Sequence, residues 1–128
     1  MSNTAANAAA FGHLTLPRTA AELALLDVQQ TADRRIDEPT LRPLMALLNG
    51  WAVQGSCLEQ DFRFPDFHAT MAFVNAVAWI AHRADHHPDL VVGYNRCRLQ
   101  WSTHSAGGLT LKDQICAAQV DALQCPKA

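Results

Sequence analysis

The sequence predicts an α+β fold, in which a four-stranded antiparallel sheet carries helices packed on one face. The 128 residues, of which 49% are hydrophobic, suit one domain with one core. Two pairs of short segments repeat their apolar residues at every second position, and longer segments around them repeat at helical spacing. A hairpin, a helix and a second hairpin favour an antiparallel sheet. We therefore expect the order α-β-β-α-β-β-α, plus an extra N-terminal helix.

Residues 1–38 are predicted to be an N-terminal extension, partly flexible, of a domain that spans residues 39–128. Residues 1–16 are small and polar without a period, and we expect a flexible tail there. The run Thr19-Ala20-Ala21-Glu22 has the spacing of a capping box, in which two side chains bond the first backbone groups of a helix. A helix is therefore expected over about residues 20–35.

The domain is expected to begin with a helix that Thr40 caps, because a threonine hydroxyl can accept a hydrogen bond from the first backbone amides. This helix carries an apolar stripe and ends at Asn49-Gly50, residue types that accept a left-handed backbone. Residues 51–64 then follow the period of a strand and predict a hairpin that turns at Gly55-Ser56.

Asp66 is a natural N-cap for a long helix. We expect this helix to end near Ala84, because Pro88 disfavours a helical backbone at His87. Its apolar face is broad enough to pack on the sheet, and Trp79 is expected in the core. The residues of that face are Phe67, Met71, Val74, Ala78 and Ala81, widened by Phe73, Val77 and Ile80.

Residues 91–101 predict the second hairpin, since Cys97, Leu99 and Trp101 share one parity. Gly107-Gly108 supplies a turn after it. Thr110-Leu111-Lys112-Asp113 is a second capping box and starts the last helix. The buried face of that helix is expected to consist of Cys116, Val120 and Leu123.

Composition argues against several classes of protein. A run of the ~18 apolar residues that a membrane-spanning helix needs is absent. The first residues lack the positive and apolar regions of a secretory signal. The net charge is −2 without a dense Lys/Arg block, so direct nucleic-acid binding is not expected. The four cysteines are widely spaced, which favours unpaired thiols in the cytoplasm over a disulfide framework or a zinc finger.

Three histidines and a carboxylate form the candidate site. His86 and His87 lie at the predicted exit of the long helix, His104 ends a strand, and Asp113 belongs to the last capping box. Imidazole changes charge near neutral pH, so such a group can act as general acid and base. Three alternatives stay open: a histidine that caps the helix, a turn histidine without a role, and a zinc site, for which His82 and His86 have helical spacing. Asp113 either only caps its helix or also orients a histidine ring.

These segments resemble the pterin-4a-carbinolamine dehydratases, also called 4a-hydroxytetrahydrobiopterin dehydratases. Two positions depart from the family, because His82 stands where the family has an acid and Leu90 where animal members have tryptophan. The matching positions are in register over about residues 40–123: His86-His87-Pro88, Tyr94, Thr103-His104 and Asp113, with Asn49-Gly50-Trp51 and Gly107-Gly108-Leu109-Thr110 around them.

The resemblance implies that the chain removes water from 4a-hydroxytetrahydrobiopterin. The product, quinonoid dihydropterin, feeds the recycling of the cofactor of aromatic amino-acid hydroxylases, as in phenylalanine hydroxylation. His86 and His104 would be the acid–base pair, His87 would position the pterin, and Asp113 would orient His104, with no metal and no cofactor. A cytoplasmic homodimer or homotetramer without direct membrane or nucleic-acid contact is also implied. The other candidates for substrate binding are Asp85, Pro88, Tyr94, Ser102, Thr103 and Ser105.

Two other functions stay open from the sequence. Some members of the family act as dimerisation cofactors of a transcription factor or as assembly factors, so a catalytically weak chain with a protein partner is the first alternative. A small metal-dependent hydrolase is the second. The retained histidines favour the dehydratase.

Overall fold

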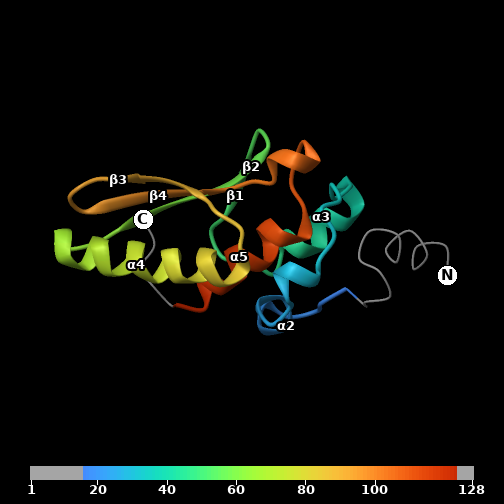
Figure 1. The fold of residues 1–128 in the computed structure, drawn as a ribbon, viewed down its shortest axis with the longest axis horizontal. Helices are drawn as coiled ribbons and strands as arrows, with labels where there is room; N and C mark the ends of the chain where they lie inside the picture. Colours follow the sequence, from blue (N-terminus) through green and yellow to red (C-terminus); the bar gives the residue numbers. More distant parts are fainter. Residues whose placement is uncertain (1–15, 124–128) are drawn as a thin grey trace.

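The computed structural model describes residues 16–123, so the predicted tail, apart from Leu16, and Cys125 lie outside the described residues. The predicted α+β fold class, with its order of helices and hairpins, is confirmed (Figure 1). The elements in chain order are α2 (Ala20–Ala24), the 3-10 turn η1 (Val28–Gln30), α3 (Glu38–Met45), β1 (Ala52–Gln54), β2 (Cys57–Arg63), α4 (Phe67–Ala84), β3 (Asp89–Val92), β4 (Arg96–Trp101), the 3-10 turn η2 (His104–Ala106) and α5 (Leu111–Asp121).

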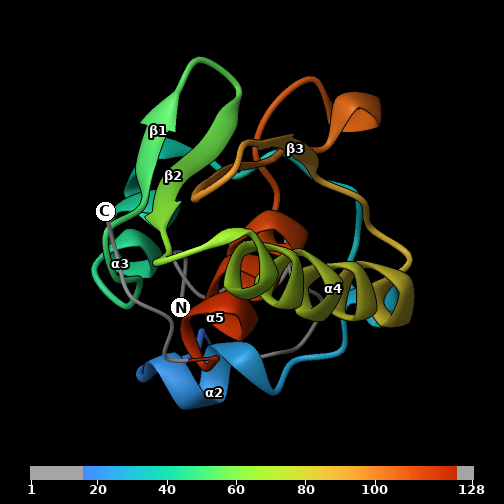
Figure 2. The same ribbon diagram turned by 90° about the vertical axis from the view of Figure 1, so that its left-hand side faces the viewer.

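The four strands form one antiparallel sheet in the order β1-β2-β4-β3. One face of its two central strands is buried by the helices, and the other face carries polar pairs such as Arg98 with Asp61. Figure 2 shows three layers: the sheet, then α4 and α5, then α2 on the far side of α5. The residues buried on the central strands are Leu58, Gln60, Phe62, Cys97, Leu99 and Trp101.

The long helix α4 begins as predicted, with the Asp66 carboxylate accepting a hydrogen bond from the Ala69 amide at 2.8 Å. Its buried face is centred on Phe73, Val77 and Ile80 rather than on the stripe that starts at Phe67. The prediction that Trp79 lies in the core is wrong, because this side chain is 60% exposed. Because α4 has apolar residues on most of its surface, their spacing in the sequence does not show which side of the helix is packed.

The N-terminal helix is shorter than predicted. Thr19 caps it, accepting a hydrogen bond from the Glu22 amide at 3.1 Å, but α2 ends at Ala24 instead of continuing to residue 35. Asp27 ends the helical pattern because its carboxylate accepts a hydrogen bond from the Gln29 amide and so caps η1 instead. Short polar side chains that compete for local backbone groups are poor residues for a helix interior.

The next helix, α3, is capped by Asp37, whose carboxylate accepts a hydrogen bond from the Thr40 amide at 3.0 Å. Thr40 is therefore inside the helix and not its cap, which corrects the prediction. Pro39 lies in the first turn, where the helix has no use for the amide that proline lacks.

The last helix, α5, is buried on nearly all sides, because α2 and η1 cover the face that α4 and the sheet leave open. Cys116 and Val120 are buried as predicted, but Leu123 lies beyond the helix and is 38% exposed. Burial raises the pKa of the Cys116 thiol to about 12, so this thiol stays protonated at neutral pH. Among the described helices, none combines the length and hydrophobicity that crossing a bilayer requires.

Candidate active site

The exit of α4 places His86. Asp85 adopts a left-handed backbone with φ 51°, and the His86 amide donates to the Ala81 carbonyl at 3.1 Å. This bond pattern closes a helix and turns the chain away from its axis. His82 and His86 therefore do not share a helical face. The backbone of His86, and not its imidazole, satisfies the helix end.

Asp85 supports a prediction about stability. An L-residue in the left-handed region is strained, whereas glycine is not. We expect Asp85→Gly to raise the free energy of unfolding by about 0.5–1 kcal/mol in urea titrations. Asp85→Ala is the matched variant and should lower it by a similar amount. Equal stabilities of the two variants would contradict this account of the helix end.

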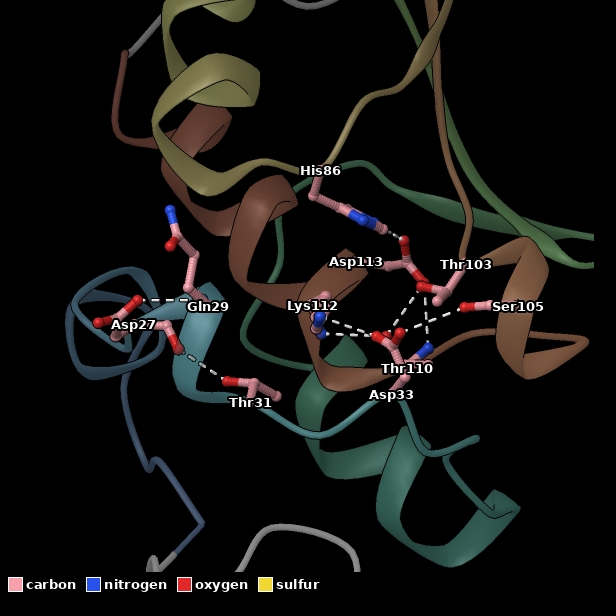
Figure 3. Close-up of polar contacts among 10 residues, drawn as sticks. All are labelled: Asp27, Gln29, Thr31, Asp33, His86, Thr103, Ser105, Thr110, Lys112 and Asp113. Carbon is pink, nitrogen blue, oxygen red and sulfur yellow. Dashed lines mark hydrogen bonds and ion pairs between the residues drawn. The ribbon is translucent and has the colours of Figure 1, made fainter.

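The imidazole of His86 reaches the carboxylate of Asp113 at the start of α5. His86 Nε2 and Asp113 Oδ1 are 2.7 Å apart, and the two side chains are 11% and 0% exposed (Figure 3). The ring lies nearly parallel to the indole of Trp101, with 5.8 Å between centroids and 9° between planes. The Trp101 N–H meets no acceptor among the described residues, so packing alone holds the indole ring in place. A carboxylate and an aromatic surface thus hold the ring in one orientation.

Asp113 is held in turn by its own hydrogen bonds. Its Oδ2 accepts from the Thr103 hydroxyl at 2.8 Å and from the Thr110 amide at 3.0 Å. The predicted capping box at Thr110 is therefore present. The expectation that Asp113 orients His104 is wrong, because its carboxylate contacts His86. Thr103 is buried and its hydroxyl bonds Asp113 and Thr110, so it is not free to bind a ligand.

The hydrogen bonds fix the tautomer that this pair favours. A carboxylate only accepts hydrogen bonds, so the proton between the two groups belongs to His86 Nε2. Nδ1 of the neutral ring then keeps its lone pair and can accept a proton from a ligand. The arrangement is a buried carboxylate beside a half-buried histidine, which is suited to general acid–base chemistry.

The other two predicted histidines stand apart from this pair. His87 follows His86 in the loop, and His104 begins η2. Both residues are exposed, and within residues 16–123 neither imidazole makes a hydrogen bond, an ion pair or a ring contact. The structure brings only His86 and Asp113 of the four predicted catalytic residues into contact. His87 and His104 are accessible to a ligand.

Some of the predicted substrate-binding residues are accessible beside the histidines, and others are already engaged by contacts within the chain. Asp85 is exposed, and Pro88 and Ser102 are half-buried, next to the histidine segments. Ser105 donates a hydrogen bond to Asp33 at 3.2 Å, so its hydroxyl is engaged by the N-terminal extension.

Tyr94 is not brought to the site. Its ring stacks on Phe67, the first residue of α4, whereas His86 follows the last residue of that helix. An 18-residue helix, about 27 Å long, separates the two ends. Figure 1 shows the β3–β4 turn beside the start of α4.

A cavity of about 650 Å³ lies beside the candidate site, between the β1–β2 turn, the start of α3 and the Gly107-Gly108 turn. No histidine lines it, and one of its carboxylates, Asp37, is already used to cap α3. The cavity therefore lacks a proton-transfer group comparable to His86. Within the described ranges, no cluster of three or more His, Cys, Asp or Glu side chains is placed to hold a metal ion.

Sequence reasoning did not find the roles of two residues in this region, Trp101 and Asp33. Trp101 was expected in the core by parity, but nothing in its spacing indicates that His86 stacks on it. Asp33 lies in the extension and contacts Ser105 and Lys112, which are distant in sequence. No local signal predicts such contacts.

Comparisons with known proteins agree with this architecture. The family described as Pterin 4 alpha carbinolamine dehydratase matches residues 34–123. A protein of Stenotrophomonas maltophilia is 51% identical over 94 residues, which cover 72% of this chain and 81% of that protein. A protein of Nitrosospira multiformis is 49% identical over 88 residues, which cover 69% of this chain and 78% of that protein. Both carry the name "Putative pterin-4-alpha-carbinolamine dehydratase".

Two solved structures have related folds. A transcriptional coactivator/pterin dehydratase from Brucella melitensis superimposes with a TM-score of 0.66 and 32% identity, over 70% of this chain and 98% of that chain. A pterin dehydratase-like protein identified as a RuBisCO assembly factor in the alpha-carboxysome gives a TM-score of 0.50 and 23% identity, over 60% of this chain and 89% of that chain. The second likeness concerns the fold alone.

Proposed function

This chain belongs to the pterin 4 alpha carbinolamine dehydratase family, and from this premise we propose that it dehydrates 4a-hydroxytetrahydrobiopterin to quinonoid dihydropterin and water. The observation that carries the proposal is the contact between half-buried His86 and buried Asp113, which supplies an oriented imidazole for proton transfer. We further propose, from the family resemblance, that the enzyme acts in the cytoplasm as a homo-oligomer and recycles the cofactor of aromatic amino-acid hydroxylases.

The reaction needs one proton to leave a ring nitrogen of the pterin and one proton to reach the departing hydroxyl. The C–O bond breaks, a C=N bond forms, and water leaves. Two imidazoles can perform both transfers. In our proposal His86 provides one of them through Nδ1, and the exposed His104 provides the other.

Asp113 has an indirect role in this proposal. Its carboxylate orients His86, and the hydroxyl of Thr103 and the amide of Thr110 hold the carboxylate in place. The exposed ring of His87 is the group that we assign to binding the pterin. Asp85, Pro88 and Ser102 line the same segments and remain candidates for contact with the substrate.

The test is the rate at which the absorbance of 4a-hydroxytetrahydrobiopterin decays. We expect the protein to accelerate the decay over the spontaneous rate, and His104→Ala to lower kcat by about 10²-fold. His68→Ala is the matched control, because His68 is an exposed histidine near the opposite end of α4. An unchanged rate with His104→Ala would refute the two-histidine mechanism, and no acceleration by the unmodified protein would refute the function.

A second candidate function is a catalytically weak interaction or assembly factor. The observation that favours it is an exposed apolar surface around Trp79, Leu25 and Leu123, beside a groove of about 410 Å³ between α4 and α5. A stoichiometric protein partner that is lost with Trp79→Glu, together with no turnover, would favour this function over the dehydratase.

A further inference from the structure

The segment between Asp27 and Ile36, named here the strap, contacts both parts of the chain that carry the candidate histidines. Figure 3 shows the second of these contacts, between Asp33 and Ser105. We propose that the strap sets the position of His86 relative to His104, with Gln29 and Asp33 as positioning residues. This inference rests on the proposed function, since it assigns the strap a role in that reaction.

The first contact lies at the exit of α4. The Gln29 amide donates from Nε2 to the Arg83 carbonyl at 3.0 Å. Arg83 is in the last turn of α4, where backbone carbonyls have no partner within the helix. Gln29 therefore supplies a partner to a carbonyl that lies three residues before His86, and so ties the strap to the first histidine segment.

The second contact lies at η2. Asp33 Oδ2 accepts a hydrogen bond from the Ser105 hydroxyl at 3.2 Å, and Asp33 Oδ1 pairs with Lys112 Nζ at 2.8 Å. Ser105 is the neighbour of His104, and Lys112 is the neighbour of Asp113. The hydrogen bond from Lys112 holds the pKa of the Asp33 carboxyl below its usual range, so Asp33 is charged at neutral pH. One carboxylate thus links the segment of His104 to the segment of Asp113.

The strap itself is held in shape. Within it, the Asp27 carboxylate accepts a hydrogen bond from the backbone N–H of Gln29. The Thr31 hydroxyl donates to the Asp27 carbonyl at 2.9 Å. Val28 is buried against the core. At the other end, the Ile36 amide donates to the Leu109 carbonyl at 2.8 Å. Because both ends are anchored, a shift of η2 relative to α4 must strain or break contacts of the strap.

The two positioning residues lie outside the part of the chain that the family model matches. The family match begins at residue 34, so both Gln29 and Asp33 lie before it. Reaction rates are sensitive to small errors in the placement of catalytic groups, and a misplacement of about 1 Å can cost about 10²-fold. The contacts of Asp33 are partly exposed, and exposed contacts are weak, so we expect smaller effects than that limit.

The experiment compares Gln29→Ala and Asp33→Ala in the whole 128-residue chain. Gln30→Ala is the control, because Gln30 is an exposed glutamine of the same turn whose side chain makes no hydrogen bond within the described residues. We expect each test variant to lower kcat by about 3- to 10-fold, with KM changed less than about twofold, because neither residue touches the substrate. Asp33→Asn keeps an acceptor for Ser105 and should recover part of the loss.

Backbone amide exchange gives a readout that does not depend on activity. Asp33→Ala should speed exchange at Ala106 and Gly107, whose amides close η2, and Gln29→Ala should speed exchange at Asp85 and His86. Faster exchange with lower kcat supports the inference. Unchanged exchange, or faster exchange with unchanged kcat, overturns it. Absence of turnover in the unmodified chain would refute the proposed function. Amide exchange would still decide whether the strap holds η2 and the exit of α4 in place.

Discussion

His86→Ala is expected to lower kcat for dehydration by about 10³-fold while leaving the protein folded. The variant removes the imidazole that Asp113 orients and Trp101 supports. The other two histidines of the candidate site, His87 and His104, are exposed, and within residues 16–123 their rings make no hydrogen bond, ion pair or ring contact, so neither is held in a position to replace it. Single-turnover kinetics separate this loss from slow product release.

The cost of this variant in stability is expected to be modest. His86→Ala leaves Asp113 Oδ1 without its partner and opens space above Trp101, but the ring is next to solvent and water can enter. We expect a loss of about 1–2 kcal/mol in urea unfolding. His68→Ala is again the control, and an equal fall in kcat for the two variants would contradict a specific role for His86.

Asp113→Asn is expected to have the largest combined effect. Three donors converge on this buried carboxylate: the Thr103 hydroxyl, the Thr110 amide and His86 Nε2. An asparagine amide accepts through one oxygen only, so at least one donor loses its acceptor, at a cost of about 2–3 kcal/mol. The amide N–H that faces His86 would favour the tautomer with the proton on Nδ1, which blocks proton acceptance there. We expect kcat to fall about 10²- to 10³-fold.

A double-variant cycle tests whether the two residues act as a unit. If Asp113 works through His86, the double variant His86→Ala/Asp113→Asn should have about the same kcat as His86→Ala alone. Multiplication of the two single losses would show instead that Asp113 acts independently. Asp61→Asn is the control for the loss of a carboxylate charge away from the site, because Asp61 pairs with Arg98 on the open face of the sheet.

The parts of the fold that sequence could predict are those that depend on local chemistry. The caps at Asp66 and Thr110 and the turn at Gly55-Ser56 follow from side chains within a few residues of the backbone that they bond. The exposure of Trp79 could not be predicted, because it depends on which side of α4 meets the sheet. The early end of α2 shows a polar residue, Asp27, overriding a weak helical period.

The candidate site divides in the same way. Histidine spacing and the resemblance identified His86 and Asp113, but 27 residues separate them, and only the packing of α5 beside α4 decides which histidine the carboxylate meets. The assignment of Asp113 to His104 therefore had no physical constraint behind it. Tyr94 matches the family in its sequence position, yet it lies beside the start of α4, whereas His86 follows the end of that helix. The sequence spacing of two residues does not fix the distance between them in the fold.

The burial of α5 between the sheet and α2 has a consequence for biosynthesis. The Gln119 side chain donates to the Ala24 carbonyl at 3.0 Å, a contact across 95 residues of chain. A ribosome makes Ala24 and the strap long before α5, so the first helix and the hairpins wait without their central partner while the rest is translated. Asp113 arrives with α5. The proton-transfer pair is therefore completed only after α5 has been translated, and a nascent chain stalled before α5 would expose the apolar faces that α5 covers.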